Sequence, residues 1–169
     1  RRFRWLQIHE SCPSIIEMRP AFISKAKSDK LHLKVDSVPD DSTSKYFCSF
    51  GLISLLTETD DNNNDKPIYI SNAIKYDNYI ICYSPPPETL SNINYDSIII
   101  RLFYNDIILT EKNVTFYDCS SYLTCTSCMN NSFGCTWQLL TATCIDRDLV
   151  TEKNEMIINN SLINQCPRY

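Results

Sequence analysis

With 169 residues, the chain is long enough to form one medium-sized domain or two small ones. Its formal net charge of −4 argues against nucleic acid and against direct contact with an anionic membrane surface, because both partners select a basic face. No apolar run approaches the roughly 20 residues that a helix needs to cross a bilayer. We therefore expect any membrane anchor to lie outside this sequence, which begins without a methionine and fits a segment of a longer protein.

The residues from about 31 to 118 have the pattern of an all-β domain. The first 20 residues hold few strand signals, whereas Leu31, Leu33 and Val35 alternate with polar residues and predict a half-buried strand. Asn105 and Asp106 separate two apolar runs and predict a hairpin turn. Further short strands are predicted at residues 46–50, 68–70, 79–82, 98–104, 107–109 and 114–116. Six or seven short strands within about 90 residues predict a β-sandwich.

One loop between these strands is strongly polar. Residues 60–65 read Asp-Asp-Asn-Asn-Asn-Asp, which is typical of a solvated connection. Carboxylates and amides are also ligands for calcium, but this loop lacks the glycine that a calcium loop needs for its sharp turn. We therefore predict no metal here.

The composition changes at Cys119, where cysteines become dense. The chain has nine cysteines, and such density in a short segment predicts a small module held together by disulfides. A helical turn is expected within residues 120–130, and a small hairpin between residues 133–137 and 142–145. Three N-glycosylation sequons, at Asn113, Asn130 and Asn159, support export to an oxidising, extracellular compartment. Six cysteines fall in the last third of the chain: Cys119, Cys125, Cys128, Cys135, Cys144 and Cys166.

Two other chemistries compete with disulfides. Four thiolates, from Cys125, Cys128, Cys135 and Cys144, could bind zinc, but structural zinc sites usually show two close cysteine pairs and the second pair is absent. A cysteine nucleophile needs a base, and the histidines of the sequence, His9 and His32, are expected to face solvent. Since no phosphate-binding loop or hydrolase motif occurs either, we predict no enzyme activity and no cofactor.

The spacing from Cys119 through Cys125, Cys128 and Cys135 to Trp137 resembles the PSI module, named for plexins, semaphorins and integrins. The fit is most specific at residues 133–137, Phe-Gly-Cys-Thr-Trp. Gln138 stands where the family usually has its fifth cysteine. A candidate for the seventh cysteine is missing as well, and because these two pair with each other in the family, their joint loss leaves no orphan thiol.

The resemblance implies a specific set of bonds. The module's pairing predicts Cys119–Cys135, Cys125–Cys166 and Cys128–Cys144, whereas sequence reasoning alone leaves all fifteen pairings of six cysteines open. Gly134 and Trp137 are expected in the core of the module. Trp137 could instead contact a ligand, but packing against the disulfides is the simpler interpretation.

The upstream part is similar to the immunoglobulin-like IPT (TIG) domain that precedes a PSI module in plexins. Tyr46-Phe47-Cys48 and Ile81-Cys82-Tyr83 match its two cysteine strands, which implies a Cys48–Cys82 bridge. Cys12-Pro13 near the start echoes Cys166-Pro167 at the end, as if an earlier PSI module finished there. The resemblance therefore predicts the tail of a preceding PSI module at 1–12, the IPT/TIG domain at 13–118, the PSI domain at 119–166, and the start of the next connection at 167–169.

Cys12 has no partner in this arrangement and is expected to be unpaired within this segment. The resemblance implies a non-catalytic extracellular stalk segment of a plexin-like, single-pass semaphorin receptor that spaces and orients the ligand-binding head. Semaphorin would bind a sema domain outside this chain, and neighbouring receptor domains or receptor copies would be the direct partners. A cell-adhesion or ligand-binding module of another PSI/IPT receptor is the alternative, and an intracellular zinc-binding protein is a third hypothesis.

Overall fold

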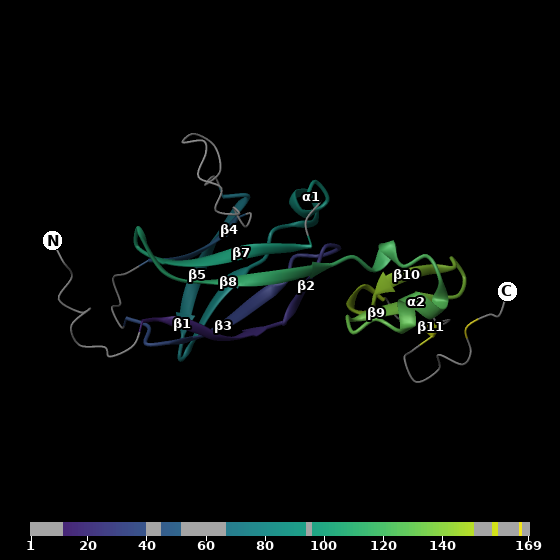
Figure 1. The fold of residues 1–169 in the computed structure, drawn as a ribbon, viewed down its shortest axis with the longest axis horizontal. Coiled ribbons are helices and arrows are strands. Elements are labelled where there is room, and N and C mark those ends of the chain that lie inside the picture. The colour runs from purple at the N-terminus through teal and green to yellow at the C-terminus, as the bar shows by residue number, and fades with distance from the viewer. Residues whose placement is uncertain are drawn as a thin grey trace. The chain divides into compact units, whose positions relative to one another are not determined.

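The computed structural model describes residues 12–39, 45–51, 67–93, 96–150, 157–158 and 166. His9, the acidic loop at 60–65, and the sequon asparagine Asn159 lie outside these residues. The described residues fall into two compact units (Figure 1). The sandwich unit lies within residues 1–23 and 27–116, and the cysteine-rich unit lies within 24–26 and 117–169. Within the described part of the chain, no helix has the length and apolar character required to cross a membrane.

The sandwich unit is built from antiparallel strands that follow one another in the order β1-β3-β6-β5-β4-β7-β8-β2. Strand β5 belongs to both layers, since it pairs with β4 from Tyr69 to Ala73 and with β6 from Ile74 to Tyr76. A short helix, α1 (Pro87–Leu90), begins at the last of three consecutive prolines. The strands are β1 (Ser14–Arg19), β2 (Phe22–Ser24), β3 (Lys30–Asp36), β4 (Tyr46–Gly51), β5 (Tyr69–Tyr76), β6 (Tyr79–Tyr83), β7 (Ser97–Tyr104) and β8 (Ile107–Tyr117).

The core between the two layers is formed by apolar residues that alternate along the strands and that the sequence pattern predicts to face inward. Leu31 and Leu33 on β3 and Phe50 on β4 are fully buried, as period-two alternation requires of a strand with one inner face. Cys48 and Cys82 are also fully buried, and a disulfide joins them across 34 residues of sequence. On the chain-entropy account, a crosslink of this span contributes about 4 kcal/mol to stability. The fully buried face of β7 consists of Ile98, Ile100 and Leu102.

Two strands of the sandwich were not predicted. The expectation that the first 20 residues hold little strand was wrong for β1, whose Ile15 and Met18 are buried in the core. The register of β1 against β3 shifts between Ile15 and Glu17, and this bulge breaks the alternation that a pattern search needs. Strand β2 has three residues and is too short to show a period.

The hairpin predicted at Asn105 and Asp106 is confirmed. These two residues connect β7 to β8, and Asn105 has φ = 53°, a left-handed conformation that asparagine tolerates better than most residues. Its side-chain Oδ1 accepts a hydrogen bond from the backbone N of Lys45 at 3.1 Å. Asp77, between β5 and β6, has the same φ of 53°. Asparagine and aspartate thus form these two hairpin turns in a chain that has only two glycines.

The cysteine-rich unit is small and contains a three-stranded sheet in the order β10-β9-β11. A 3-10 turn (Cys119–Ser121) and α2 (Cys125–Met129) precede the sheet, so the expected helical turn is present. The expected hairpin is present as well, formed by β9 (Cys135–Gln138) and β10 (Thr143–Asp146). A second 3-10 turn (Arg147–Leu149) follows, and β11 (Ile157–Ile158) pairs with β9.

Candidate functional site

Cysteines make up most of the buried residues in the core of the cysteine-rich unit. Five cysteines, Met129 and Trp137 form one buried cluster, and Tyr117, Tyr122, Phe133 and Cys166 pack against it. A unit with so little apolar area cannot offset the entropy of folding by burial alone. The disulfides are therefore the feature on which its stability depends. The five buried cysteines are Cys119, Cys125, Cys128, Cys135 and Cys144.

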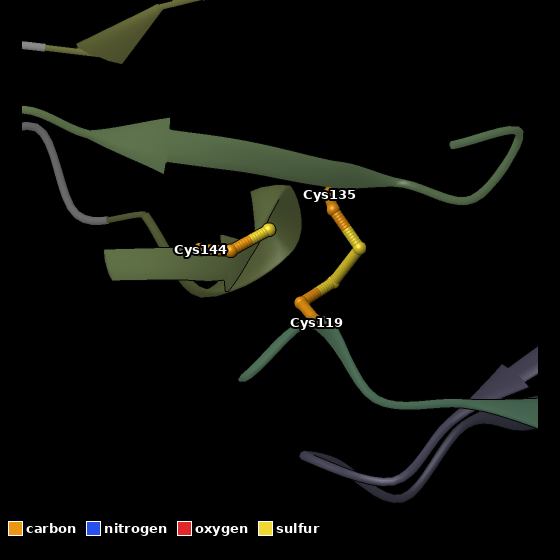
Figure 2. A group of neighbouring side chains, drawn as sticks. All are labelled: Cys119, Cys135 and Cys144. Atoms are coloured by element: carbon orange, nitrogen blue, oxygen red, sulfur yellow. A yellow bond between two sulfur atoms is a disulfide. The ribbon is translucent and has the colours of Figure 1, made fainter. Parts of the chain in front are cut away.

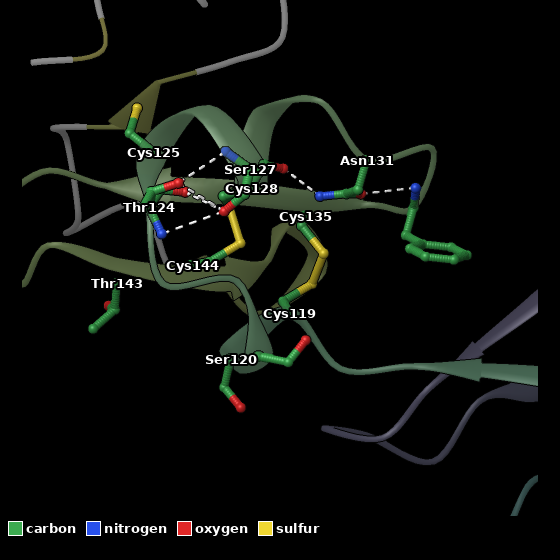
Figure 3. The surroundings of a disulfide bond; sticks show 12 residues. Cys119, Ser120, Thr124, Cys125, Ser127, Cys128, Asn131, Cys135, Thr143 and Cys144 are labelled. Carbon is green, nitrogen blue, oxygen red and sulfur yellow. Dashed lines mark hydrogen bonds between the residues drawn. A yellow bond between two sulfur atoms is a disulfide. The ribbon is translucent and has the colours of Figure 1, made fainter. Parts of the chain in front are cut away.

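Three disulfides crosslink the first 3-10 turn, α2, β9, β10 and Cys166, and Figure 3 shows the two of them that join Cys119 to Cys135 and Cys128 to Cys144. Cys119 in the first 3-10 turn joins Cys135 at the start of β9, and Cys128 on α2 joins Cys144 on β10; each of these bonds spans 16 residues. The remaining bond links Cys125, the first residue of α2, to Cys166. Loops of this length correspond to about 3 to 4 kcal/mol per bond on the chain-entropy account.

Helix α2 presents two of these cysteines, and its start is fixed by its own sequence. The Thr124 hydroxyl accepts a hydrogen bond from the backbone N of Ser127 at 3.1 Å, and the Ser127 hydroxyl is 3.3 Å from the backbone N of Thr124, from which it accepts. This reciprocal capping box occupies backbone donors that a five-residue helix would otherwise leave unpaired. At the other end, the side chain of Asn131 donates to the backbone oxygen of Cys128 (Figure 3).

Two of the disulfides are close neighbours. The sulfur atoms of Cys119, Cys135 and Cys144 all lie within 4.8 Å of one another (Figure 2). The Cys128–Cys144 bond therefore lies next to the Cys119–Cys135 bond (Figure 3). The four cysteines that could have formed a zinc site each contribute to a disulfide in this structure. A disulfide sulfur is not a thiolate, and thiolates are the form that binds metal. Zinc binding would therefore require a reduced chain.

Trp137 lies in the middle of this arrangement. It is on β9, the central strand, opposite Cys144 on β10 and opposite Ile158 on β11. Its side chain is buried in the sulfur cluster, and its neighbour Thr136 is buried as well. A buried tryptophan covers a large area, so a single side chain here packs against much of the module.

A buried carboxylate was not found by sequence reasoning. Asp146, at the end of β10, is 2% exposed, and its Oδ2 accepts a hydrogen bond from the Tyr117 hydroxyl at 2.8 Å. Its Oδ1 accepts from the backbone N of Asp148 at 3.0 Å, which fixes the following 3-10 turn. The ring of Tyr117 stacks on Phe133, with centroids 5.0 Å apart and planes 2° apart. No local pattern marks Asp146, because its partner Tyr117 is 29 residues earlier in the chain.

Replacing Tyr117 with phenylalanine tests this contact. The variant keeps the stacked ring but removes the hydroxyl donor to a buried carboxylate, so we expect the cysteine-rich unit to lose about 1.5–3 kcal/mol of stability. The measurement is amide hydrogen exchange of β9 and β10 in the whole chain. The matched control is Tyr76→Phe, on the exposed surface of the sandwich unit, which should leave those amides unchanged. Equal protection in both variants would show that the hydroxyl contributes nothing.

The structure corrects the expectation for Gly134. This residue was predicted in the core, but it is exposed. A Cβ built on it would lie 3.7 Å from the Tyr117 hydroxyl oxygen, an ordinary contact distance, and its φ is not positive. Its backbone oxygen accepts from the backbone N of Arg147 at 2.8 Å. Gln138, at the position of the family's fifth cysteine, is half-buried and accepts a hydrogen bond from the Thr141 hydroxyl.

The other described residues that the sequence analysis singled out are exposed or half-buried. Asn113 on β8 and Asn130 after α2 are exposed, so both sequons are accessible, and glycan attachment stays a prediction. Cys12 is exposed and unpaired. His32 is half-buried rather than fully solvent-facing, because its ring lies edge-on to Tyr79, with centroids 6.3 Å apart.

Comparison with known protein families finds a separate match for each of the two units. The family model of the plexin TIG domain matches residues 19–117, and the model called Plexin repeat, the PSI domain, matches residues 118–167. The first of these covers more than half of the chain, and the second begins where the first ends.

Several plexins are similar in sequence. Plexin-B3 of Mus musculus is 23% identical over 154 residues, which cover 83% of this chain and 7% of the relative. Plexin-B2 of Mus musculus is 25% identical over 98% of this chain and 9% of the relative, and Plexin-2 of Caenorhabditis elegans is 26% identical over 70% of this chain and 6% of the relative. The chain thus spans less than a tenth of the length of these curated relatives.

Two solved structures of the full extracellular region of plexin A4 share the fold. Their TM-scores are 0.61 and 0.62, at 20% and 21% sequence identity, and they cover 84% and 89% of this chain but only 13% and 12% of the solved chains. From the two family models, the relatives and these structures, we conclude that the chain belongs to the plexin family, with the TIG–PSI arrangement of a plexin ectodomain.

Proposed function

We propose that this chain is a rigid, non-catalytic spacer within the extracellular stalk of a semaphorin receptor. The observation that carries the proposal is that each unit is closed by its own disulfides: Cys48–Cys82 in the sandwich unit and three bonds in the cysteine-rich unit. Disulfides limit how far the crosslinked elements of a module can separate, so such a module resists bending and opening. Such modules hold the distance along a stalk.

The surroundings of the functional groups support a structural role rather than catalysis. Among the described residues, the cysteines other than Cys12 are in disulfides and so supply no nucleophile. The ring of His32, on β3, lies next to the ring of Tyr79, and no cysteine takes part in this contact. General acid–base and nucleophilic catalysis need such groups within hydrogen-bonding reach of each other. We propose that ligand recognition belongs to a sema domain elsewhere in the receptor, as membership of the plexin family suggests.

An extracellular location follows from the same chemistry. Four disulfides persist in an oxidising compartment and would be reduced in the cytosol. The exposed sequons at Asn113 and Asn130 fit export through the secretory pathway. We propose that the anchor is a single membrane-spanning segment outside this chain.

The test separates spacing from binding in the full-length receptor. One variant replaces residues 13–166 with a flexible glycine–serine linker, which lacks the stiffness of folded modules. We expect this receptor to reach the surface and bind semaphorin with unchanged affinity, but to lose most of its semaphorin-induced signalling. A control receptor carries the equivalent rigid TIG–PSI pair of another plexin and should keep signalling. Unchanged signalling with the flexible linker would contradict the spacer role.

A second experiment addresses the alternative of a ligand-binding module. The isolated 169-residue chain is immobilised and exposed to soluble semaphorin. The spacer account predicts no saturable binding. Saturable binding that persists when the salt concentration is moderately raised would instead favour direct recognition by an exposed face of the sandwich unit.

A further inference from the structure

The outer surface of the sandwich unit carries an unusual concentration of exposed apolar side chains around β5. Ile70, Ile74 and Tyr76 on β5 are 52%, 70% and 72% exposed. Tyr83 on β6 is 51% exposed, and so is Ile108 on β8. Together with the half-buried pair Phe47 and Phe103, these side chains define what we call the β5 face.

On strand β5, apolar side chains point to solvent and a polar side chain points to the core, which is the reverse of the usual pattern. Its isoleucines at positions 70 and 74 point outward, whereas Ser71 is 5% exposed and lies on the inner side. The Ser71 hydroxyl is satisfied there, since it accepts from the backbone N of Tyr83 at 2.9 Å and donates to the backbone oxygen of Asn72 at 3.1 Å. A one-residue shift of register would exchange the two sets. The observed register therefore keeps apolar groups on the surface.

Two grooves on the outer surface meet at β5, which pairs with one layer over Tyr69–Ala73 and with the other over Ile74–Tyr76. A groove of about 600 Å³ is lined by residues that include Ile70, Ile74, Tyr76 and Tyr83. A second groove of about 310 Å³ is lined by Phe47, Phe103 and Ile108, and it shares Ile70 with the first. Between the strands, Phe47 and Phe103 stack with centroids 4.5 Å apart and planes 9° apart. Ile70 is thus at the centre, with one groove on each side.

The central strands beneath this face, β4 and β7, have partners on both edges. Strand β5 pairs with β4 over Tyr69–Ala73 and with β6 over Ile74–Tyr76. An incoming chain therefore cannot add to β4 or β7 as a further strand. What remains is packing of side chains, face against face, as two sheets pack in a sandwich.

The area and charge of this face fit a copy of itself. Five side chains between half and three-quarters exposed present roughly 500–700 Å² of surface, given about 150–250 Å² for a large side chain. A standard interface buries about 800 Å² per partner, of which about 60% is apolar. Of the described residues lining the two grooves, only Lys30, Arg101 and Glu111 are charged, and the last two are paired at 3.2 Å. Two copies therefore meet without strong repulsion, although the chain as a whole carries a charge of −4.

We propose that the β5 face is a homophilic interface, on which a second copy of this chain packs face to face about a two-fold axis near Ile70. In such an isologous contact, the residue on the axis meets its own equivalent, and the aromatic side chains of one copy enter the grooves of the other. The composition agrees, since tyrosine, phenylalanine and arginine are enriched in interfaces. This interface goes beyond the spacer role, because it would bring two receptor stalks together side by side.

The test is sedimentation equilibrium of the 169-residue chain carrying Cys12→Ser, which prevents a disulfide through the exposed thiol. We expect a reversible dimer with a micromolar Kd, in the weak part of the range for interfaces of this area. Ile74→Arg should weaken dimerisation at least tenfold. Its matched control is Ile16→Arg on β1, which is 59% exposed but outside the β5 face and should leave the Kd unchanged.

A crosslinking variant locates the axis independently. In the Cys12→Ser background, Ile70→Cys should form a disulfide-linked dimer under mild oxidation, and Ile16→Cys should not. A chain that stays monomeric up to about 100-fold above a micromolar Kd would overturn the proposal, as would equal dimerisation of the Ile74→Arg variant. Crosslinking at position 16 as fast as at position 70 would also contradict it. A monomer whose β5 face binds a different receptor domain would assign the face to another partner.

Discussion

Replacing Cys128 with serine is expected to give a chain that is retained in the secretory pathway or aggregates. The change removes the Cys128–Cys144 bond, which ties α2 to β10 and contributes about 3 kcal/mol. It also leaves a free thiol on Cys144, whose sulfur lies within 4.8 Å of both sulfurs of the Cys119–Cys135 bond (Figure 2). A thiolate in that position can attack the neighbouring bond and exchange partners. We therefore expect mispaired species.

The double variant Cys128→Ala with Cys144→Ala separates the two effects. It lacks the same bond but has no free sulfur beside Cys119 and Cys135, so it should be less stable yet correctly paired at the other three bonds. Secretion yield and non-reducing electrophoresis of both variants provide the readout. If the single variant is secreted at the normal level with a single pairing, the adjacency of the two disulfides has no chemical consequence.

Truncating Trp137 to alanine should lower the free energy of unfolding of the cysteine-rich unit by about 3–5 kcal/mol. The indole is buried in one cluster with five half-cystines. Because the disulfides restrict how far the unit can collapse around the cavity, little of the loss should be recovered. The measurement is hydrogen exchange of the β9 and β10 amides, since these report on this unit separately from the sandwich.

The control for Trp137 is Leu140→Ala. Leu140 is in the turn between β9 and β10 and is 70% exposed, so its truncation should change stability by less than about 0.5 kcal/mol. Similar losses in both variants would mean that the unit is held by its crosslinks alone. Preserved stability with altered binding of a partner would instead favour a ligand-contacting role for Trp137.

The sequence predicted the sandwich well where a strand alternates regularly between a buried and an exposed face. Leu31 and Leu33 on β3, and Ile100 and Leu102 on β7, follow a strict alternation, and the structure buries these residues. The pattern failed at β1, where a bulge after Ile15 shifts the register. It also failed to give the length of β5, because that strand changes partners at Ile74 and keeps apolar residues outside.

The cysteine-rich unit was predictable only in part. Cysteine density indicated disulfides, but spacing alone permits fifteen pairings, and the implied pairs came from resemblance to the PSI family. We propose that the four bonds present in the structure are those of the protein in solution. The Tyr117–Asp146 hydrogen bond could not be predicted, since it depends on how the elements pack. Gly134 was expected in the core because of its motif, yet it is exposed.

The central claim, that disulfides hold both units in shape, is tested most directly by peptide mapping under non-reducing conditions after thiol alkylation of the intact, folded chain. We predict one alkylated cysteine, Cys12, and four linked peptide pairs: Cys48–Cys82, Cys119–Cys135, Cys125–Cys166 and Cys128–Cys144. A folded chain in which the six cysteines of the cysteine-rich unit are all alkylated would contradict the account.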